Sequence, residues 1–344
     1  MKQTTTIFGG YAGEYADFAT AGLFGMRSGE KAMAAKEKRE TVPVFFASDD
    51  NYLPFLDVAL SSVKANASKK FDYKIFVLHS GIKGKNAEKV MRLSDDGFQI
   101  RFVDVADHLK KIAKFLQLRD YYTSAIYYRL FIVGMFPQLD KAVYLDCDTV
   151  VLGDISELYF TDLKENLIGA VADGAVASVP VFSKYTKEVL GIEGKNYFNS
   201  GVIVMNLKKF REVDFYGAFC EMLAGYDFRV APDQACLNLL CKDKVYYFSE
   251  AWNRMPQGVA NGEEAKLVHY NLAQKPWHYK GVKYEEYFWQ YAKNSVFYPQ
   301  ISAQLQAFTP EMARRDQEGG ENLLKLAQSE SEREDNYYRR YLAK

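Results

Sequence analysis

Two carboxylates follow a run of apolar residues near the middle of the chain. Residues 143–154 read VYLDCDTVVLGD, which places Asp146 and Asp148 two positions apart at the end of a strand-like segment. Side chains two apart on a strand point to the same face, and open α/β sheets bind ligands beyond the carboxyl ends of their strands. The pattern predicts that both carboxylates reach one divalent cation. The alternative is that both acids cap a turn, a frequent role of aspartate.

A histidine later in the chain is the third candidate ligand. His269 lies in LVHYNLAQKPWHYK, after an apolar pair and before the Lys-Pro-Trp that contains Lys275. Two carboxylates and one imidazole suit Mn²⁺, with Mg²⁺ as the second candidate. Lys275 would supply positive charge to a diphosphate oxygen. The competing interpretations are a structural histidine and a solvated surface lysine.

The chain has no glycine-rich loop for binding phosphates. The first predicted strand, 42–48, is followed by DDNY, and neither GxGxxG nor GxxxxGK[ST] follows any strand. A nucleotide bound there would need a cation, and hence carboxylates, to neutralise its phosphates.

Strand-like and helix-like segments alternate through the first half of the chain, which predicts a parallel sheet covered by helices. The predicted strands are 42–48, 72–80, 98–105, 141–148, 167–173, 200–207 and a short edge-like 245–248. The predicted helices are 55–66, 85–96, 124–136, one that opens with PDQACLN at 232, and a charged tail from 309 that Gly319 and Gly320 break.

Length and composition limit the domain organisation and the class of protein. The 344 residues predict an arm or linker (1–41), an α/β domain (42–285) and a helical C-terminal extension (286–344). Lys plus Arg and Asp plus Glu number 44 each, which argues against a nucleic acid partner.

Location is predicted from cysteine usage and from the lack of targeting segments. The four cysteines form no CxxC pair, which favours a reducing compartment. No signal peptide or membrane-spanning run is evident, so we expect a cytoplasmic protein. Arginines among aromatic residues in the tail predict peripheral contact with the inner face of a membrane. The alternative is a solvated helix of balanced charge.

Five segments in order carry a resemblance to a known family. They are FFASDDNYLPFLDVALSS, YLDCDTVVLGDISELY, YFNSGVIVMNLKKFR, PDQACLN and HYNLAQKPWH, and they span roughly 42–280. Together they resemble glycosyltransferase family 8, which includes bacterial lipopolysaccharide galactosyl- and glucosyltransferases. The resemblance implies a GT-A fold, with a Rossmann-like mixed, mostly parallel sheet, and Mn²⁺-dependent transfer of a hexose from a UDP-sugar with retention of configuration.

The resemblance also implies roles for individual residues. Uracil and ribose would be held by Ala47, Asp49, Asn51 and Tyr52. The metal ligands would be Asp146, Asp148 and His269, with Lys275 at the diphosphate. The transferred sugar would be contacted by Arg129, Asp173, Asn199, Asp233 and Gln234. Leu272 departs from the family, many members of which have glycine there, and this predicts a different backbone approach to the diphosphate.

The predicted function is a retaining hexosyltransferase that moves galactose or glucose from a UDP-sugar to a glycan or lipid-linked acceptor. Gln234 or Asp233 would face the oxocarbenium-like sugar. Glutamine is a poor nucleophile, so front-face attack by the acceptor is favoured over a covalent intermediate. Two alternatives are a UDP-sugar-binding module without turnover and a metal-dependent phosphohydrolase.

Overall fold

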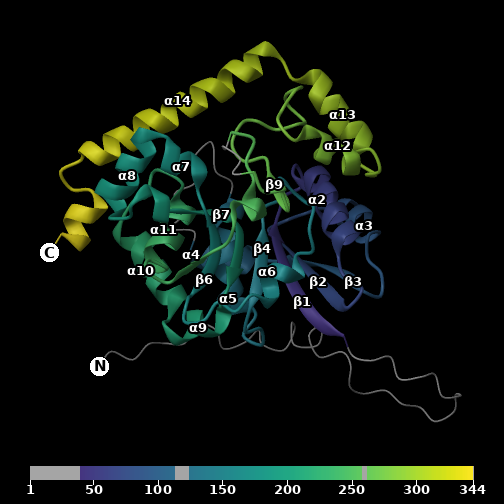
Figure 1. Cartoon of the computed structure of the whole chain (residues 1–344), viewed down its shortest axis with the longest axis horizontal. Coiled ribbons are helices and arrows are strands. Elements are labelled where there is room, and N and C mark those ends of the chain that lie inside the picture. The colour runs from purple at the N-terminus through teal and green to yellow at the C-terminus, as the bar shows by residue number, and fades with distance from the viewer. Residues whose placement is uncertain (1–38, 113–123, 258–261, 344) are drawn as a thin grey trace, which may run out of the picture.

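The computed structural model describes residues 39–112, 124–257 and 262–343. The predicted N-terminal arm lies outside these residues except for 39–41. Within the described ranges, one seven-stranded sheet has the order β3-β2-β1-β4-β7-β6-β8, and β5 and β9 form a separate pair (Figure 1). The strands are β1 (Glu40–Ala47), β2 (Phe71–His79), β3 (Phe98–Asp104), β4 (Ala142–Leu145), β5 (Thr149–Val151), β6 (Ile168–Ala172), β7 (Phe198–Met205), β8 (Val245–Tyr247) and β9 (Leu267–His269).

The sheet is mixed and mostly parallel, as predicted. Strands β3, β2, β1 and β4 are parallel neighbours, and β8 is parallel to β6. Strand β7 runs antiparallel to both β4 and β6. The start of β7 therefore lies beside the end of β4, where the Asp146 N–H donates to the Gly201 carbonyl at 2.8 Å. This reversal brings residues 199–201 to the two aspartates.

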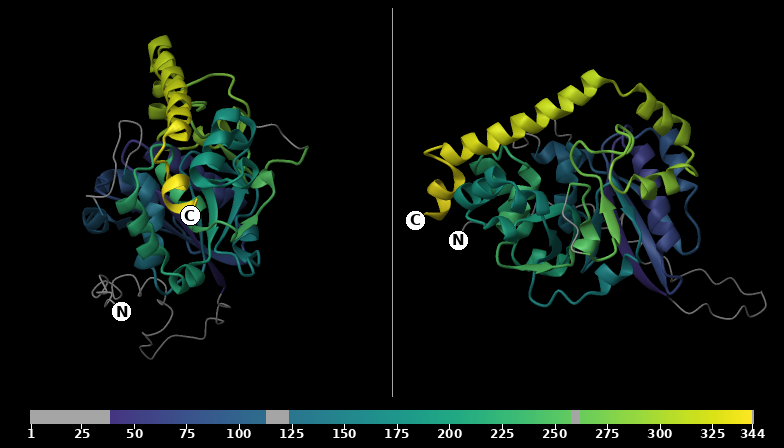
Figure 2. Two further views of the ribbon diagram at one scale, coloured as in Figure 1. Left: turned by 90° about the vertical axis from the view of Figure 1, so that its left-hand side faces the viewer. Right: turned by 45° about the horizontal axis from the view of Figure 1, so that its top comes forward.

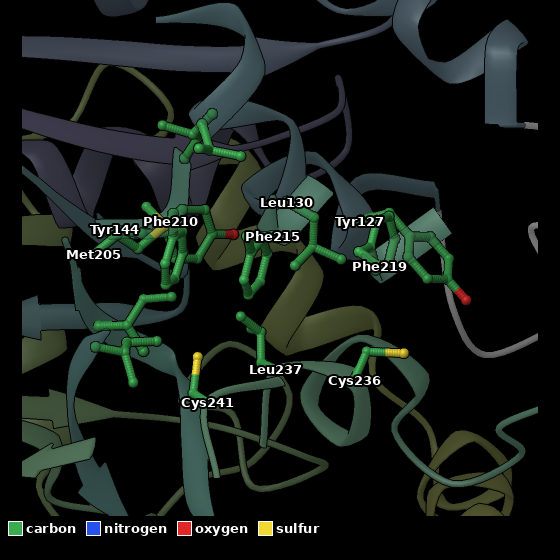
Figure 3. Packing of buried hydrophobic residues seen from close by; sticks show 14 of the residues in the cluster. Tyr127, Leu130, Tyr144, Met205, Phe210, Phe215, Phe219, Cys236, Leu237 and Cys241 are labelled. Atoms are coloured by element: carbon green, nitrogen blue, oxygen red, sulfur yellow. The ribbon is translucent and has the colours of Figure 1, made fainter. Parts of the chain in front are cut away.

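Helices cover both faces of the sheet over two apolar cores. Figure 3 shows one core, in which Tyr144 and Met205 of the sheet lie near Phe210, Phe215 and other helix residues. The longer helices are α2 (Leu53–Asn66), α3 (Gly84–Met91), α4 (Ala106–Ile112), α8 (Pro180–Leu190), α10 (Phe215–Gly225), α11 (Pro232–Leu240), α12 (Glu285–Ala292), α13 (Tyr298–Ala307) and α14 (Pro310–Glu332). The short ones are α5 (Ile132–Met135), α6 (Ser156–Phe160), α7 (Gly174–Ser178) and α9 (Leu207–Glu212).

Two elements near the aspartates differ from the sequence prediction. The predicted strand 141–148 ends at Leu145, so Asp146 and Asp148 lie in a turn and not on one face of a strand. The Thr149 hydroxyl donates to the Asp146 carbonyl at 2.8 Å and closes that turn. The predicted helix 124–136 is a 3₁₀ helix as far as Phe131 and continues as α5.

The predicted break of the tail helix is wrong. Helix α14 is continuous over 23 residues and includes both Gly319 and Gly320. Each glycine costs about 1 kcal/mol relative to alanine, but burial of Leu323, Leu326 and Ala327 against one core offsets that cost. The helix crosses the top of the molecule from α13 to α8 (Figures 1 and 2). Among the described helices, none is both long and apolar enough to cross a membrane.

Candidate functional site

Asp146, Asp148 and His269 come together at one edge of the sheet. One ligand atom from each lies within 4.8 Å of the others. His269 Nε2 is 3.2 Å from Asp148 Oδ1 and 3.8 Å from Asp146 Oδ2. The pairing of β5 with β9 sets Thr149 opposite His269, and this brings the histidine to the turn that carries both aspartates. The three side chains form a set of donors suited to a divalent cation.

Neighbouring side chains fix the orientation of two of these ligands. The Tyr144 hydroxyl donates to Asp146 Oδ1 at 2.9 Å, so Oδ2 is the oxygen nearer His269. Buried Asn253 lies 3.0 Å from His269 Nδ1 through its Oδ1. An Nδ1–H that donates to this oxygen leaves Nε2 as the acceptor that faces the carboxylates. Sequence reasoning missed Asn253, because its role depends on a contact between segments 16 residues apart.

Gly201 leaves space that two of the three ligands, Asp146 and His269, occupy. A Cβ at this position would overlap His269 Cε1 and would lie 2.6 Å from Asp146 Oδ2. Glycine is required here by the close approach of the ligands and not by its backbone angles. The ligands and this cradle together fit a small cation.

Lys275 is buried against the cluster. Its ammonium donates to Asp148 Oδ2 and, at 2.6 Å, to the Tyr270 carbonyl. Burial alone would raise the pKa of Asp148, but the charge of Lys275 outweighs burial and holds that pKa well below its usual value. Burial would lower the pKa of Lys275, and Asp148 raises it. Asp148 is therefore ionised and Lys275 is charged at neutral pH.

The loop after β1 lies next to the two aspartates. The thiol of Cys147, between them, donates to the Ala47 carbonyl at 3.1 Å. Asp49 Oδ1 accepts the backbone N–H groups of Asn51 at 2.9 Å and Tyr52 at 3.0 Å, which shapes the loop. The Tyr52 ring is 37% exposed. The structure thus places the loop predicted to hold uracil and ribose next to the carboxylate turn, through the contact of Cys147 with Ala47.

A cavity of about 240 Å³ opens next to the three ligands. All five residues predicted to contact the sugar line it: Arg129, Asp173, Asn199, Asp233 and Gln234. Apolar side chains form another part of the wall: Ile126, Val176, Phe182, Val230 and Leu323. Neither Lys275 nor the loop after β1 lines this cavity. The cavity is therefore separate from the predicted nucleotide-binding residues, and the three ligands lie at its edge.

The polar residues of the cavity are interlocked by hydrogen bonds. Gln234 Oε1 accepts the Ser200 N–H at 2.9 Å, and its Nε2 donates to Asp173 Oδ2 at 3.2 Å. The Asn199 amide donates to the same Asp173 oxygen at 3.3 Å. The other oxygen of Asp173 accepts two backbone N–H groups at the start of α7. Three of the predicted sugar-binding residues are thus held in fixed positions.

Arg129 connects the ligand cluster to Asp233. It is 5% exposed, and it pairs with Asp146 at 3.0 Å and with Asp233 at 3.5 Å. It also donates to the Ser200 carbonyl at 2.5 Å. Burial raises the pKa of Asp233, and the Arg129 charge opposes that rise. Arg129 therefore positions two acids of the site through direct contacts.

Leu272 has the backbone conformation that glycine favours. Its φ is 56°, and its side chain is 57% exposed at the cavity wall. A non-glycine residue in this region costs roughly 1–2 kcal/mol. The leucine therefore keeps a glycine-like backbone and adds an apolar side chain to the cavity.

Several known proteins with similar sequences or structures are glycosyltransferases. A putative glycosyltransferase of Haemophilus influenzae is 27% identical over 63% of this chain, and the match covers 64% of that protein's length. Lipopolysaccharide 1,2-glucosyltransferase of Escherichia coli is 27% identical over 71% of this chain and 76% of its own. The solved galactosyltransferase LgtC, in complex with donor and acceptor sugar analogs, is 29% identical with a TM-score of 0.64, covering 74% of this chain and 96% of that one.

The family model gives the same result. Residues 43–281 match the model of glycosyl transferase family 8, and this range contains every site residue predicted from the sequence. Similarity to LgtC also identifies the sheet and its helices as a GT-A fold. The chain belongs to glycosyl transferase family 8.

Proposed function

We propose that this protein transfers a hexose, glucose or galactose, from a UDP-sugar to a glycan or lipid-linked acceptor, with retention of configuration and with Mn²⁺. One observation carries the proposal: Asp146, Asp148 and His269 meet between the loop after β1 and the cavity lined by the five predicted sugar-binding residues. The crystallised LgtC complex with donor and acceptor sugar analogs supports both substrate classes.

We assign a separate role to each group of residues in the site. Asp49 and its loop would bind uracil and ribose, and Lys275 would face the diphosphate. Asp146, Asp148 and His269 would hold the cation, which stabilises negative charge on the departing diphosphate when it is bound. Asp173, Asn199 and Arg129 would fix the sugar.

Front-face attack suits the geometry better than a covalent intermediate. The bond between the anomeric carbon and the diphosphate oxygen breaks, the acceptor oxygen attacks from the same face, and its proton passes to the departing phosphate. Gln234 Oε1 already accepts the Ser200 N–H, and Asp233 is paired with Arg129. Both contacts reduce nucleophilicity, which supports this route over attack by either side chain.

An assay with several donors tests the proposal. The purified protein is incubated with UDP-glucose or UDP-galactose and a panel of glycan acceptors, with Mn²⁺, with Mg²⁺ or with EDTA. We expect release of UDP together with transfer of the sugar, and loss of both in EDTA. Release of inorganic phosphate would point to a phosphohydrolase, and tight binding without turnover would point to a binding module.

We also propose that the protein works at the inner, cytoplasmic face of a membrane, where lipid-linked acceptors are found. The similarity to lipopolysaccharide glucosyltransferases supports such an acceptor. Arg314 and Arg315 on α14 are 64% and 73% exposed, and both are paired with Glu311. They would provide the electrostatic contact with anionic lipid.

A further inference from the structure

The segment between α10 and α11 forms part of the cavity wall in a strained conformation. Val230 and Ala231 line the cavity, and Asp233 and Gln234 follow directly in α11. Ala231 has φ 43°, in the left-handed region that non-glycine residues rarely adopt. Such a conformation costs on the order of 1 kcal/mol or more and persists only when neighbouring contacts impose it.

A buried carboxylate from α14 contacts this segment. Glu330 is 1% exposed, and its oxygens accept the Tyr226 hydroxyl at 3.2 Å and Arg229 Nη1 at 3.1 Å. Arg333 Nη1 donates to the same carboxylate at 3.0 Å. A buried charge with three donors is well paired, so removal of the charge would leave two arginines and a tyrosine with a weaker acceptor.

Residues that follow Glu330 contact the same segment. The Tyr337 ring packs on Tyr226 and Phe228, with centroids 5.3 and 5.2 Å apart. The Tyr341 hydroxyl donates to the Gly225 carbonyl at 2.9 Å. We call Glu330, Tyr337 and Tyr341 the C-terminal clamp, because each of them contacts the chain between Gly225 and Arg229.

Helix α14 also reaches the cavity directly. Leu323, about two turns before Glu330, lines the cavity, as does Phe182 of α8. The same helix therefore supplies part of the wall and, through the clamp, holds the segment that leads to Asp233 and Gln234. Leu323 and the clamp residues all lie beyond 281, where the match to the family model ends.

We propose that Glu330 is a positioning residue of the transferase site. It holds residues 226–231 so that Asp233 and Gln234 keep their places against the donor sugar, and in this it rests on the proposed function. The contacts reach the sugar side of the site and not the loop after β1. Replacement of Glu330 should therefore weaken binding of the hexose and leave binding of the UDP unchanged.

The test compares Glu330→Gln with a matched control, Glu332→Gln. Glu332 lies on the same helix, is exposed, and bonds to Gln328 across the helix surface. Hydrogen exchange monitors the backbone amides of 225–234. Calorimetry with Mn²⁺ measures affinity for UDP, UDP-glucose and UDP-galactose, and donor hydrolysis gives kcat. Tyr341→Phe is a milder second variant that removes only the bond to Gly225.

For Glu330→Gln we expect at least about tenfold faster exchange at 225–234, unchanged exchange in β1 and α2, and UDP affinity within about twofold of the unmutated protein. The ratio of UDP-hexose affinity to UDP affinity should fall about tenfold, and kcat should fall by a similar factor. Tyr341→Phe should give intermediate values, and Glu332→Gln should leave both quantities unchanged. Equal exchange in Glu330→Gln and Glu332→Gln would overturn the proposal. An equal loss of affinity for UDP and for the UDP-hexoses would also overturn the proposal, because it would indicate general destabilisation of the protein.

Failure of the proposed function gives a different result. The unmutated protein and Glu332→Gln would then both fail to bind UDP or to turn over either donor. Hydrogen exchange would still decide whether Glu330 holds residues 226–231, because it needs no substrate.

Discussion

Each ligand of the proposed cation site is oriented by a different neighbour. Tyr144 and Arg129 hold Asp146, Lys275 pairs with Asp148, and Asn253 faces the His269 ring. Because these contacts come from four separate segments, the geometry is fixed before a cation binds. We therefore expect a large effect when a ligand is replaced and a smaller effect when a neighbour of a ligand is replaced.

Asp148→Ala should abolish Mn²⁺-dependent turnover, with at least about a hundredfold loss of kcat, because it removes one of three ligands. Asp146→Ala and His269→Ala should behave alike. Circular dichroism and thermal melts check that each variant is folded. Mn²⁺-stimulated activity that is unchanged in Asp148→Ala would refute the central claim.

Asn253→Ala should weaken Mn²⁺ binding about 10- to 100-fold, the usual effect of removing a partner of a ligating histidine. Asn253→Asp keeps an acceptor for the imidazole N–H and should lose less. Calorimetric titration of Mn²⁺ measures both. An alanine variant that binds Mn²⁺ as tightly as the unmutated protein would mean that Asn253 does not orient His269.

Asp49 should select uracil. Both backbone contacts of its carboxylate use Oδ1, so Oδ2 is available to accept the N3–H of uracil. Cytosine presents an acceptor at N3, and two facing acceptors cost roughly 1–3 kcal/mol. UDP should therefore bind at least about tenfold tighter than CDP.

Asp49→Asn sharpens this test, because its amide oxygen can keep the loop contacts while its NH₂ group faces the base. The preference for UDP should shrink and the Mn²⁺ requirement should remain. Calorimetric titration of UDP and CDP with Mn²⁺ provides the measurement. Equal affinities in the unmutated protein would show that the loop after β1 does not read the base.

At the scale of helices and strands, local sequence predicted where the elements lie in the chain better than it predicted which elements pair or pack together. The apolar runs at 42–48 and 72–80 indicated β1 and β2, because buried parallel strands are apolar on both faces. The reversal of β7 was not predicted, since pairing direction depends on where a distant chain segment returns. The contacts of Asn253 and the continuity of α14 through Gly319 depend on tertiary packing in the same way.

Helix α2 contains an acid that should reduce stability at neutral pH. Asp57 is 3% exposed and accepts the Ser295 hydroxyl at 2.5 Å. Burial raises its pKa in the folded protein, and the bond from Ser295 opposes the rise. The folded state therefore favours the neutral carboxyl, and an energetic cost develops as the pH rises from the unfolded pKa of about 3.9 through the folded value.

Asp57→Asn should therefore raise Tm at pH 7, and the gain should shrink as the pH falls toward about 4. Thermal melts over this pH range measure the difference, with the exposed Asp96→Asn as the control. A gain that is equal at all pH values, or a lower Tm at pH 7, would contradict the assignment of ionisation as the cause.

At the scale of the whole molecule, the C-terminal helices are packed onto the sheet domain. Helix α12 contacts α2, and α14 contacts α8. The division into an arm (1–41), a transferase domain (42–285) and an extension (286–344) stays a prediction. The packing indicates that removal of the extension would expose apolar residues of the core and open the cavity. Charge reversal is therefore a cleaner test of membrane contact than truncation.

Arg314→Glu combined with Arg315→Glu should weaken binding to anionic vesicles at least about tenfold, since each cation near such a surface contributes about 1 kcal/mol. Lys69→Glu with Lys70→Glu changes the net charge equally at two exposed positions just before β2 and serves as the control. Co-sedimentation with phosphatidylserine vesicles is the measurement. Equal sedimentation of the two double variants and the unmutated protein would exclude contact through α14 and leave the transferase assignment intact.

The position of α14 in the chain bears on how the protein is made. Ribosomes add residues from the N-terminus, and domains begin to fold as they emerge. The sheet, the three ligands and the loop after β1 all precede residue 285, whereas Leu323 and Glu330 come later. A nascent chain can therefore assemble the proposed cation and nucleotide sites while the cavity beside them still lacks one wall. During synthesis, the ability to bind UDP should come before the ability to transfer a hexose.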